Sequence, residues 1–225
     1  TLRTYLGDSL FFAGLTSFLN ANKFKHISSY DLRDYLSTFS GINLTPYFDN
    51  WIFDKGFPHF YIDSMQVLPN SNEFDVHVYL RQRKQQNAQY FSKVPLEIGF
   101  YDAQMNKHIY KLLFDGRCME FKVKLPFQPE MTVLDPDSKI SDAITEESRF
   151  IKTVGIANLT QAKCRVLTKV INNPADSSLV RVEHNWVRPD RFKTQQAANG
   201  YVLCDSRYWK VDGIKLSNVQ GLLHF

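Results

Sequence analysis

The stretch that decides the fold is Asp49–Pro58, which reads DNWIFDKGFP. A tryptophan-bearing helix is predicted to end at Gly56, because glycine readily adopts the backbone conformation that terminates a helix. Pro58 is predicted to open an extended segment, since proline is tolerated at the first residue of a strand. The sequence therefore predicts a change from helical to β structure at this point.

Residues 1–55, which precede the junction, carry helical periodicity. Leu2, Leu6 and Leu10 recur about one helical turn apart. When successive residues are placed at about 100° around the axis, the apolar side chains up to Phe18 go nearly all the way round one continuous helix. A helix that is apolar on every side is normally buried on every side. Two further short helices can hardly cover it, so the sequence predicts a missing neighbour.

These two short helices are predicted from their end signals. Ser28 or Ser29 caps the first of them, and Gly41 ends it in the left-handed conformation. In the second, Thr45 is expected to be the N-cap and Pro46 the first helical residue. Both helices are thus expected before the junction.

After Pro58 the apolar periodicity changes from helical to alternating. Residues 74–81 alternate apolar with polar side chains, which is typical of a half-buried strand. Turn signals follow at Asp115–Gly116 and Asp135–Asp137. The sequence predicts antiparallel strands over residues 58–137, most simply a β-sandwich.

The predicted fold class is therefore α+β, with an N-terminal helical segment followed by one or two antiparallel β-sandwich domains. The expected division is a helical segment at 1–57, a β-sandwich at 58–137, a polar connector at 138–151 and a second, incomplete β-rich domain at 152–225. A polar stretch at 194–200 is predicted to be a mobile loop.

Composition excludes several classes of protein. No apolar run approaches the ~20 residues of a membrane span, so no membrane span is predicted. The net charge is +4, and the densest basic run is Arg81–Lys84. Nucleic-acid-binding proteins usually cluster Lys and Arg on one face, so this run is predicted to be a solvated strand end, and no nucleic-acid partner is expected. Cys118, Cys164 and Cys204 lie far apart and are predicted to be buried thiols, with one disulfide left open.

A search for catalytic motifs finds no complete active site. The histidines are separated in sequence, and none lies in the His-Glu-x-x-His pattern of zinc hydrolases. There is no Gly-x-Ser-x-Gly elbow and no Gly-rich phosphate loop. The paired carboxylates Glu146 and Glu147 lie in the polar connector and are predicted to be solvated. We therefore predict no catalytic, cofactor-binding or metal-binding residue in this chain. The histidines are His26, His59, His77, His108, His184 and His224.

Two local features leave alternatives open. Glu183–Trp186 reads EHNW in a strand-like segment, where a half-buried, hydrogen-bonded histidine is a commoner arrangement than a chemical role. A Cys204–His184 pair remains an alternative nucleophilic site, although nothing marks the thiol as activated. Trp186 and Trp209 offer a sugar or peptide platform, whereas aromatic packing in a core is the favoured interpretation.

A series of anchors in the helical segment resembles the end of the catalytic domain in zinc aminopeptidases of the aminopeptidase N type. The strands that follow, up to Asp137, look like the small β-sandwich of that family. Residues 152–225 look more loosely like the tail of large exported bacterial aminopeptidase-like proteins. The anchors are Leu2–Asp8, Phe11–Leu15, Asp31–Leu32, Ser40–Gly41, Phe48–Trp51 and Gly56–Pro58.

This resemblance implies a C-terminal portion of a zinc-dependent aminopeptidase, whose natural start lies upstream. The intact protein would hydrolyse N-terminal residues from peptides through a zinc-activated water. No position here matches the family's zinc ligands, glutamate base, transition-state tyrosine or Gly-x-Met-Glu-Asn loop. Zinc and the peptide substrate are therefore expected in the upstream catalytic domain, which this non-catalytic portion would complete and brace. The resemblance also suggests export, for example to a bacterial periplasm. The alternative is a scaffold or protein-binding module from a zinc-less relative.

Overall fold

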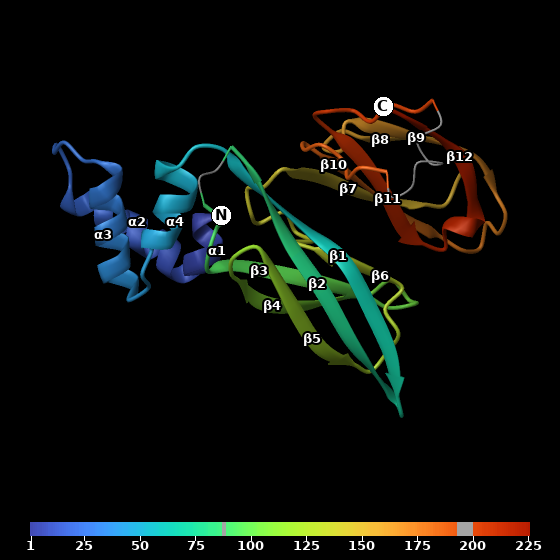
Figure 1. The fold of residues 1–225 in the computed structure, drawn as a ribbon, viewed down its shortest axis with the longest axis horizontal. Coiled ribbons are helices and arrows are strands. Elements are labelled where there is room, and N and C mark those ends of the chain that lie inside the picture. Colours follow the sequence, from blue (N-terminus) through green and yellow to red (C-terminus); the bar gives the residue numbers. More distant parts are fainter. Residues whose placement is uncertain (87–88, 193–199) are drawn as a thin grey trace.

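The computed structural model describes residues 1–86, 89–192 and 200–225. A helical block lies at one end, and antiparallel sheets form the rest of the molecule (Figure 1). The predicted α+β fold class is thus confirmed. None of the helices in the described ranges has the length and apolar character needed to cross a bilayer. The helical elements are α1 (Leu2–Leu6), α2 (Asp8–Ala21), α3 (Ser29–Ser40), α4 (Thr45–Phe48) and a π-helical turn (Asp49–Phe53).

The first helical segment is broken at Gly7, where the sequence predicts one continuous helix. Gly7 adopts φ 73° and ψ 163°, a conformation that favours glycine. The helix continues as α2, which packs on α3 at Gly14. A Cβ at Gly14 would come within 2.8 Å of a methyl group of Leu36, so a larger residue here would force the buried Leu36 side chain to move.

The caps of α3 follow the prediction, and those of α4 do not. Ser28 is the N-cap of α3 and forms a capping box with Asp31, whose carboxylate accepts from the Ser28 backbone N–H at 2.8 Å. Gly41 closes α3 in the left-handed conformation. Leu44 precedes α4, so Thr45 is its first residue and not its N-cap.

The strands of the first sandwich form two three-stranded sheets, β1-β2-β5 and β4-β3-β6. Val76 and Val78 of β2 lie in one core with Ile98 and Phe100 of β3, and all four are fully buried. The alternation seen in the sequence therefore has its apolar side inward. The strands are β1 (Phe57–Asn70), β2 (Glu73–Gln85), β3 (Val94–Tyr101), β4 (Lys107–Phe114), β5 (Cys118–Leu125) and β6 (Met131–Leu134).

The remaining strands form a second sandwich from the sheets β11-β10-β7 and β12-β9-β8. Its core contains Val180 and Val182 of β10 with Leu159 and Val166 of the opposite sheet. The loop predicted at 194–200 lies, apart from Gly200, outside the described residues. The strands are β7 (Ile144–Ile151), β8 (Gly155–Leu159), β9 (Cys164–Ile171), β10 (Ser178–Asn185), β11 (Tyr208–Ile214) and β12 (Val219–His224).

The predicted connector at 138–151 is wrong in its second half, because Ile144–Ile151 is strand β7. Both faces of β7 carry polar residues, so its sequence lacks the apolar alternation of a half-buried strand. β7 pairs along its full length with β10, which places Glu146 opposite Glu183. The division of the chain into separate domains stays a prediction.

Trp51 links the helical block to the first sandwich. Its ring stacks on Tyr47 of the helical core at 5.6 Å and meets Phe91 of the sandwich core edge-on at 4.6 Å. Its indole N–H donates to the Ser141 carbonyl at 3.0 Å. The side chain is partly buried and packs against both cores.

The two sandwiches meet through an apolar contact and a buried polar one. Met131 and Val133 of β6 share a cluster with Leu179 of β10 and with Ile214. Nearby, His59 of β1 and Asn185 of β10 are hydrogen-bonded at 2.9 Å.

We expect truncation of Trp51 to loosen the junction. Trp51→Ala should lower the free energy of unfolding by about 3 kcal/mol, because it removes ring contacts to two cores. Trp51→Phe keeps most of the ring but removes the hydrogen bond to Ser141, so its cost should be about 1 kcal/mol. Urea unfolding followed by circular dichroism measures both values. Leu19→Ala is the control, because Leu19 is 62% exposed and should change little. Equal stability of Trp51→Ala and the control would contradict this role.

Candidate functional site

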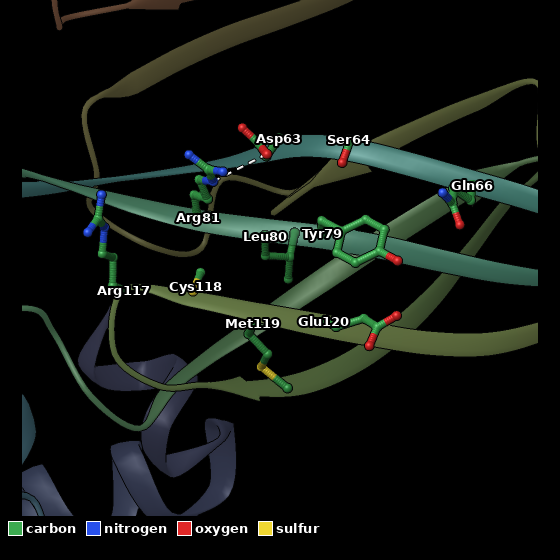
Figure 2. A pocket seen from close by; sticks show the side chains of 10 residues that line it. All are labelled: Asp63, Ser64, Gln66, Tyr79, Leu80, Arg81, Arg117, Cys118, Met119 and Glu120. Carbon is green, nitrogen blue, oxygen red and sulfur yellow. Dashed lines mark ion pairs between the residues drawn. The ribbon is translucent and has the colours of Figure 1, made fainter.

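A hollow of about 660 Å³ lies on the outer face of the β1-β2-β5 sheet. Figure 2 shows side chains from all three strands around it. We call this hollow the outer groove. Its polar lining consists of Asp63, Ser64 and Gln66 from β1, Tyr79 and Arg81 from β2, and Arg117 and Glu120 from the third strand and its approach.

A β-bulge shapes the outer groove. Ile62 pairs with Leu80 and Ser64 pairs with Tyr79, so Asp63 is an extra residue in β1. A bulge of this kind redirects side chains and is common beside functional sites. Here it accompanies an ion pair in which Asp63 meets Nε of Arg81 at 3.2 Å, drawn as a dashed line in Figure 2.

The sequence carries a signal for this bulge that motif searching misses. The apolar positions that pack on the core are Phe60 and Ile62 before the bulge, and Val67 after it. Phe60 and Ile62 are two residues apart, as expected for one face of a strand, but Ile62 and Val67 are five apart. An odd separation on one face requires one extra residue, because side chains alternate between the faces. A break in the alternation at Asp63 therefore indicates the site without any catalytic motif.

Two guanidinium groups stand at one end of the outer groove. The Arg81 side chain is 50% exposed, and only its Nε approaches Asp63. Arg117 is exposed, and its side chain has no ion pair or hydrogen bond within the described ranges. The Arg117 carbonyl accepts from the Gln82 backbone N–H at 2.9 Å, which fixes the start of the third strand. Several strong donors thus remain available to a ligand.

The other end of the outer groove carries a carboxylate that is already paired. Glu120 lies 3.0 Å from Nδ1 of His77 and 3.2 Å from Nζ of Lys122. The hydrogen bond with His77, aided by Lys122, lowers the pKa of Glu120 below its ordinary value. With Asp63 and Glu120 opposing the two arginines, the groove lining has no net charge.

The histidines are not assembled into a metal site. In the part of the chain that the structure describes, no group of three or more His, Cys, Asp or Glu side chains is placed to hold a metal ion. His77 contacts Glu120, and His108 contacts Asp102 at 3.1 Å. His59 and His184 are fully buried.

The EHNW segment forms an aromatic stack and not a nucleophilic site. His184 lies between Trp186 and Trp209, with ring centroids at 4.2 and 4.5 Å. Among the described residues, neither His184 nitrogen has a hydrogen-bond partner. Cys204 is exposed and lies 3.5 Å from the Ser206 hydroxyl, so the alternative Cys204–His184 pair is not formed.

The structure confirms some of the remaining aromatic and thiol predictions and contradicts others. Trp209 is half-buried against the second core and donates to the Ala162 carbonyl at 2.8 Å, as core packing predicts. Trp186 is 41% exposed, whereas Trp209 is half-buried. The two indoles therefore do not form a shared surface platform. Cys164 is buried, whereas the prediction of buried thiols is wrong for Cys118 and Cys204.

Glu146 corrects the prediction of a solvated carboxylate pair. It contacts Arg181, which is 1% exposed and also meets Glu183 at 2.5 Å and Asp212 at 3.2 Å. These residues project from three neighbouring strands on the face of β10 that is turned away from the second core. We call them the Arg181 cluster. Strand pairing, which sequence spacing does not reveal, brings them together.

The basic run at Arg81–Lys84 is solvated at Arg81 and Lys84, as predicted, but not at Gln82 and Arg83. Gln82 is buried and exchanges hydrogen bonds with the Phe91 backbone at 2.7 and 3.1 Å. Arg83 lies over the Tyr61 ring at 4.6 Å and pairs with Asp190 at 2.5 Å. Arg81 and Arg83 lie on the same face of β2, where Arg81 lines the outer groove and Arg83, farther along the strand, pairs with Asp190.

No protein-family model and no curated protein matches this sequence. Among solved structures, Legionella pneumophila aminopeptidase A, in complex with aspartic acid, is similar to 59% of this chain, with a TM-score of 0.48 and 18% sequence identity. The match covers 15% of that protein, so this chain spans only a small part of its length. No function is transferred from a likeness of this size.

The buried His59 predicts a loss of stability in acid. Burial, with Arg83 adding to it, lowers the pKa of His59 from 6.5 to about 4. The unfolded chain therefore takes up a proton below about pH 6.5 that the folded protein resists until about pH 4. Across that window His59 should cost up to about 3 kcal/mol of stability as the pH falls, and nothing above it.

Urea unfolding at a series of pH values measures this effect. His59→Gln should flatten the pH profile between about 6.5 and 4, because the new amide does not titrate. His26→Gln is the matched control, since His26 lies in an exposed turn. Parallel profiles for the wild type and His59→Gln would show that His59 is not responsible.

The Arg181 cluster predicts a large penalty for removing its cation. Arg181→Met leaves three carboxylates without their shared partner, and we expect a loss of about 3–5 kcal/mol. Arg149→Met is the control, because Arg149 is 54% exposed in its pair with Glu147 and should cost less than about 1 kcal/mol. Thermal unfolding measures both. Similar melting temperatures for the two variants would contradict a structural role for the cluster.

Proposed function

We propose that this chain is a non-catalytic, accessory portion of a zinc-dependent aminopeptidase, where it completes and braces the peptidase domain. The order of sequence anchors over residues 2–58 supports this assignment. In this proposal the zinc ion, its ligands and the peptide substrate belong to an upstream catalytic domain of a longer protein, for which export is part of the same hypothesis.

The exposed apolar surface of the helical block is the observation that carries the proposal. Burying one such Leu or Phe side chain contributes about 1.5–3 kcal/mol. Large exposed apolar groups gathered on one part of a protein indicate a protein-binding surface. The exposed side chains are Phe12 (54%), Leu19 (62%), Ile27 (49%), Tyr30 (55%) and Phe39 (41%).

The rest of the fold suits a bracing role. The helical block is fastened to the first sandwich through Trp51 and through Thr4, whose hydroxyl donates to the Lys139 carbonyl at 3.1 Å. The second sandwich is fastened to the first through the buried His59–Asn185 bond. A covering domain would thus be held by a rigid support.

The alternative function is a scaffold or protein-binding module from a zinc-less relative. The outer groove favours it, because this open, polar hollow faces away from the core and is available to a partner. The two functions differ in whether the longer protein binds zinc and hydrolyses peptides.

Two preparations separate these functions. We expect residues 1–225 alone to bind no stoichiometric zinc and to hydrolyse no aminoacyl-p-nitroanilide. The longer protein, expressed from the same reading frame, should bind zinc and lose its activity with a chelator. Zinc binding with turnover by residues 1–225 would overturn the proposal. A longer protein that binds no zinc would favour the scaffold.

A surface variant tests the covered helical face directly. Phe12→Ser combined with Leu19→Ser should leave the melting temperature of residues 1–225 nearly unchanged, because both side chains are exposed there. In the longer protein the same pair should lower stability and activity, since buried apolar contacts are lost. Leu222→Ser, at a 49% exposed position on β12, is the control. An equal effect in both lengths of protein would refute this contact.

A further inference from the structure

We propose that the outer groove binds an extended, acidic polypeptide segment, with a carboxylate of the ligand held by Arg81 and Arg117. This inference concerns the first sandwich alone and does not rest on the proposed peptidase role. Figure 2 shows both guanidinium groups projecting at the same end of the hollow.

The two arginines of the groove supply hydrogen-bond donors. A guanidinium group offers five N–H donors in a planar fork that matches a carboxylate. Arg81 approaches Asp63 only through Nε, at 3.2 Å, and makes no side-chain hydrogen bond within the described ranges. Arg117 has neither an ion pair nor a side-chain hydrogen bond there. The strongest unmet interaction in the groove is therefore with an anionic group.

The bulge in β1 holds part of this site in position. Because Asp63 is the extra residue, its carboxylate contacts Arg81 without occupying a place in the strand ladder. The pair leaves Nη1 and Nη2 of Arg81 as the groups that can meet a ligand. Asp63 is thus a positioning residue, since it orients Arg81 and does not itself bind an anion.

The open shape of the groove suits a peptide better than a small molecule. Small-molecule sites usually enclose most of their ligand. The outer groove is instead an open hollow of about 660 Å³ that crosses three neighbouring strands. An extended peptide is a better match for a shallow surface of this kind.

The charges along the groove are balanced. Asp63 and Glu120 balance the charge of the two arginines, so a dense polyanion such as nucleic acid would gain no net attraction along the groove. A polypeptide carries isolated carboxylates separated by neutral amides. Its amides can bond to Gln66 and Ser64, while the Tyr79 ring offers apolar contact.

Fluorescence polarisation tests the proposal on residues 1–225. The probe is a fluorescein-labelled peptide of about eight residues with alternating Glu and Ala, compared with the same peptide carrying Gln. The Glu peptide should bind with the higher affinity. Arg117→Gln and Arg81→Gln should each weaken it about tenfold, because each removes a charge-assisted hydrogen-bonding group.

The matched control is Lys124→Gln. Lys124 is exposed on the same strand as Glu120 but does not line the groove, so its loss should change affinity less than about twofold. Both arginines are exposed, and a thermal melt checks that each variant remains folded.

Several outcomes would overturn the proposal. They are the absence of binding at about 1 mM protein, equal affinity for the Glu and Gln peptides, and an equal loss in Lys124→Gln. A heparin oligosaccharide that binds the groove more tightly than the Glu peptide would assign it to a sulfated polysaccharide instead. Binding that depends on Arg117 and Arg81 but not on Lys124 would support it.

Discussion

Backbone hydrogen bonds of residues 139–143 hold the three parts of the molecule together. The carbonyls of Lys139 and Ser141 accept from Thr4 and Trp51 of the helical block. The N–H of Ala143 donates to Pro58 of β1 at 2.9 Å, and its carbonyl accepts from the N–H of Trp186 at 2.8 Å. This short segment therefore ties both the helices and the second sandwich to the first sandwich. Ile140 anchors it by packing into the first core.

The contact between the sandwiches combines an apolar cluster with buried polar groups. Arg181 pairs with its carboxylate partners within the β11-β10-β7 sheet, while its buried Nε has no hydrogen-bond partner among the described residues. Met131 and Leu179 pack across the interface. Buried ion clusters add little net stability, but breaking one is costly.

The sequence predicted the elements that rest on local signals. The change of period after Pro58, the Ser28 cap and the alternating β2 follow from short-range patterns that tertiary contacts reinforce. Strand β7 was missed because its polar residues are satisfied by β10, a partner distant in sequence. The outer groove was missed for a related reason. It has no catalytic motif, and its residues meet only through strand register and the bulge at Asp63. The break in alternation at that residue was the one local trace of it.

The two candidate contact surfaces differ in chemistry, and this difference separates their roles. The helical block exposes Leu19 and other large apolar side chains, and apolar contact is typical of permanent interfaces. The outer groove is polar, open and without net charge, as in contacts that form and dissociate. β1 connects them physically, since it begins beside the Trp51 junction and passes Asp63 on the groove. A domain held on the helices would therefore keep a fixed position relative to a polypeptide in the groove. The first sandwich is thus suited to present a bound polypeptide to that domain.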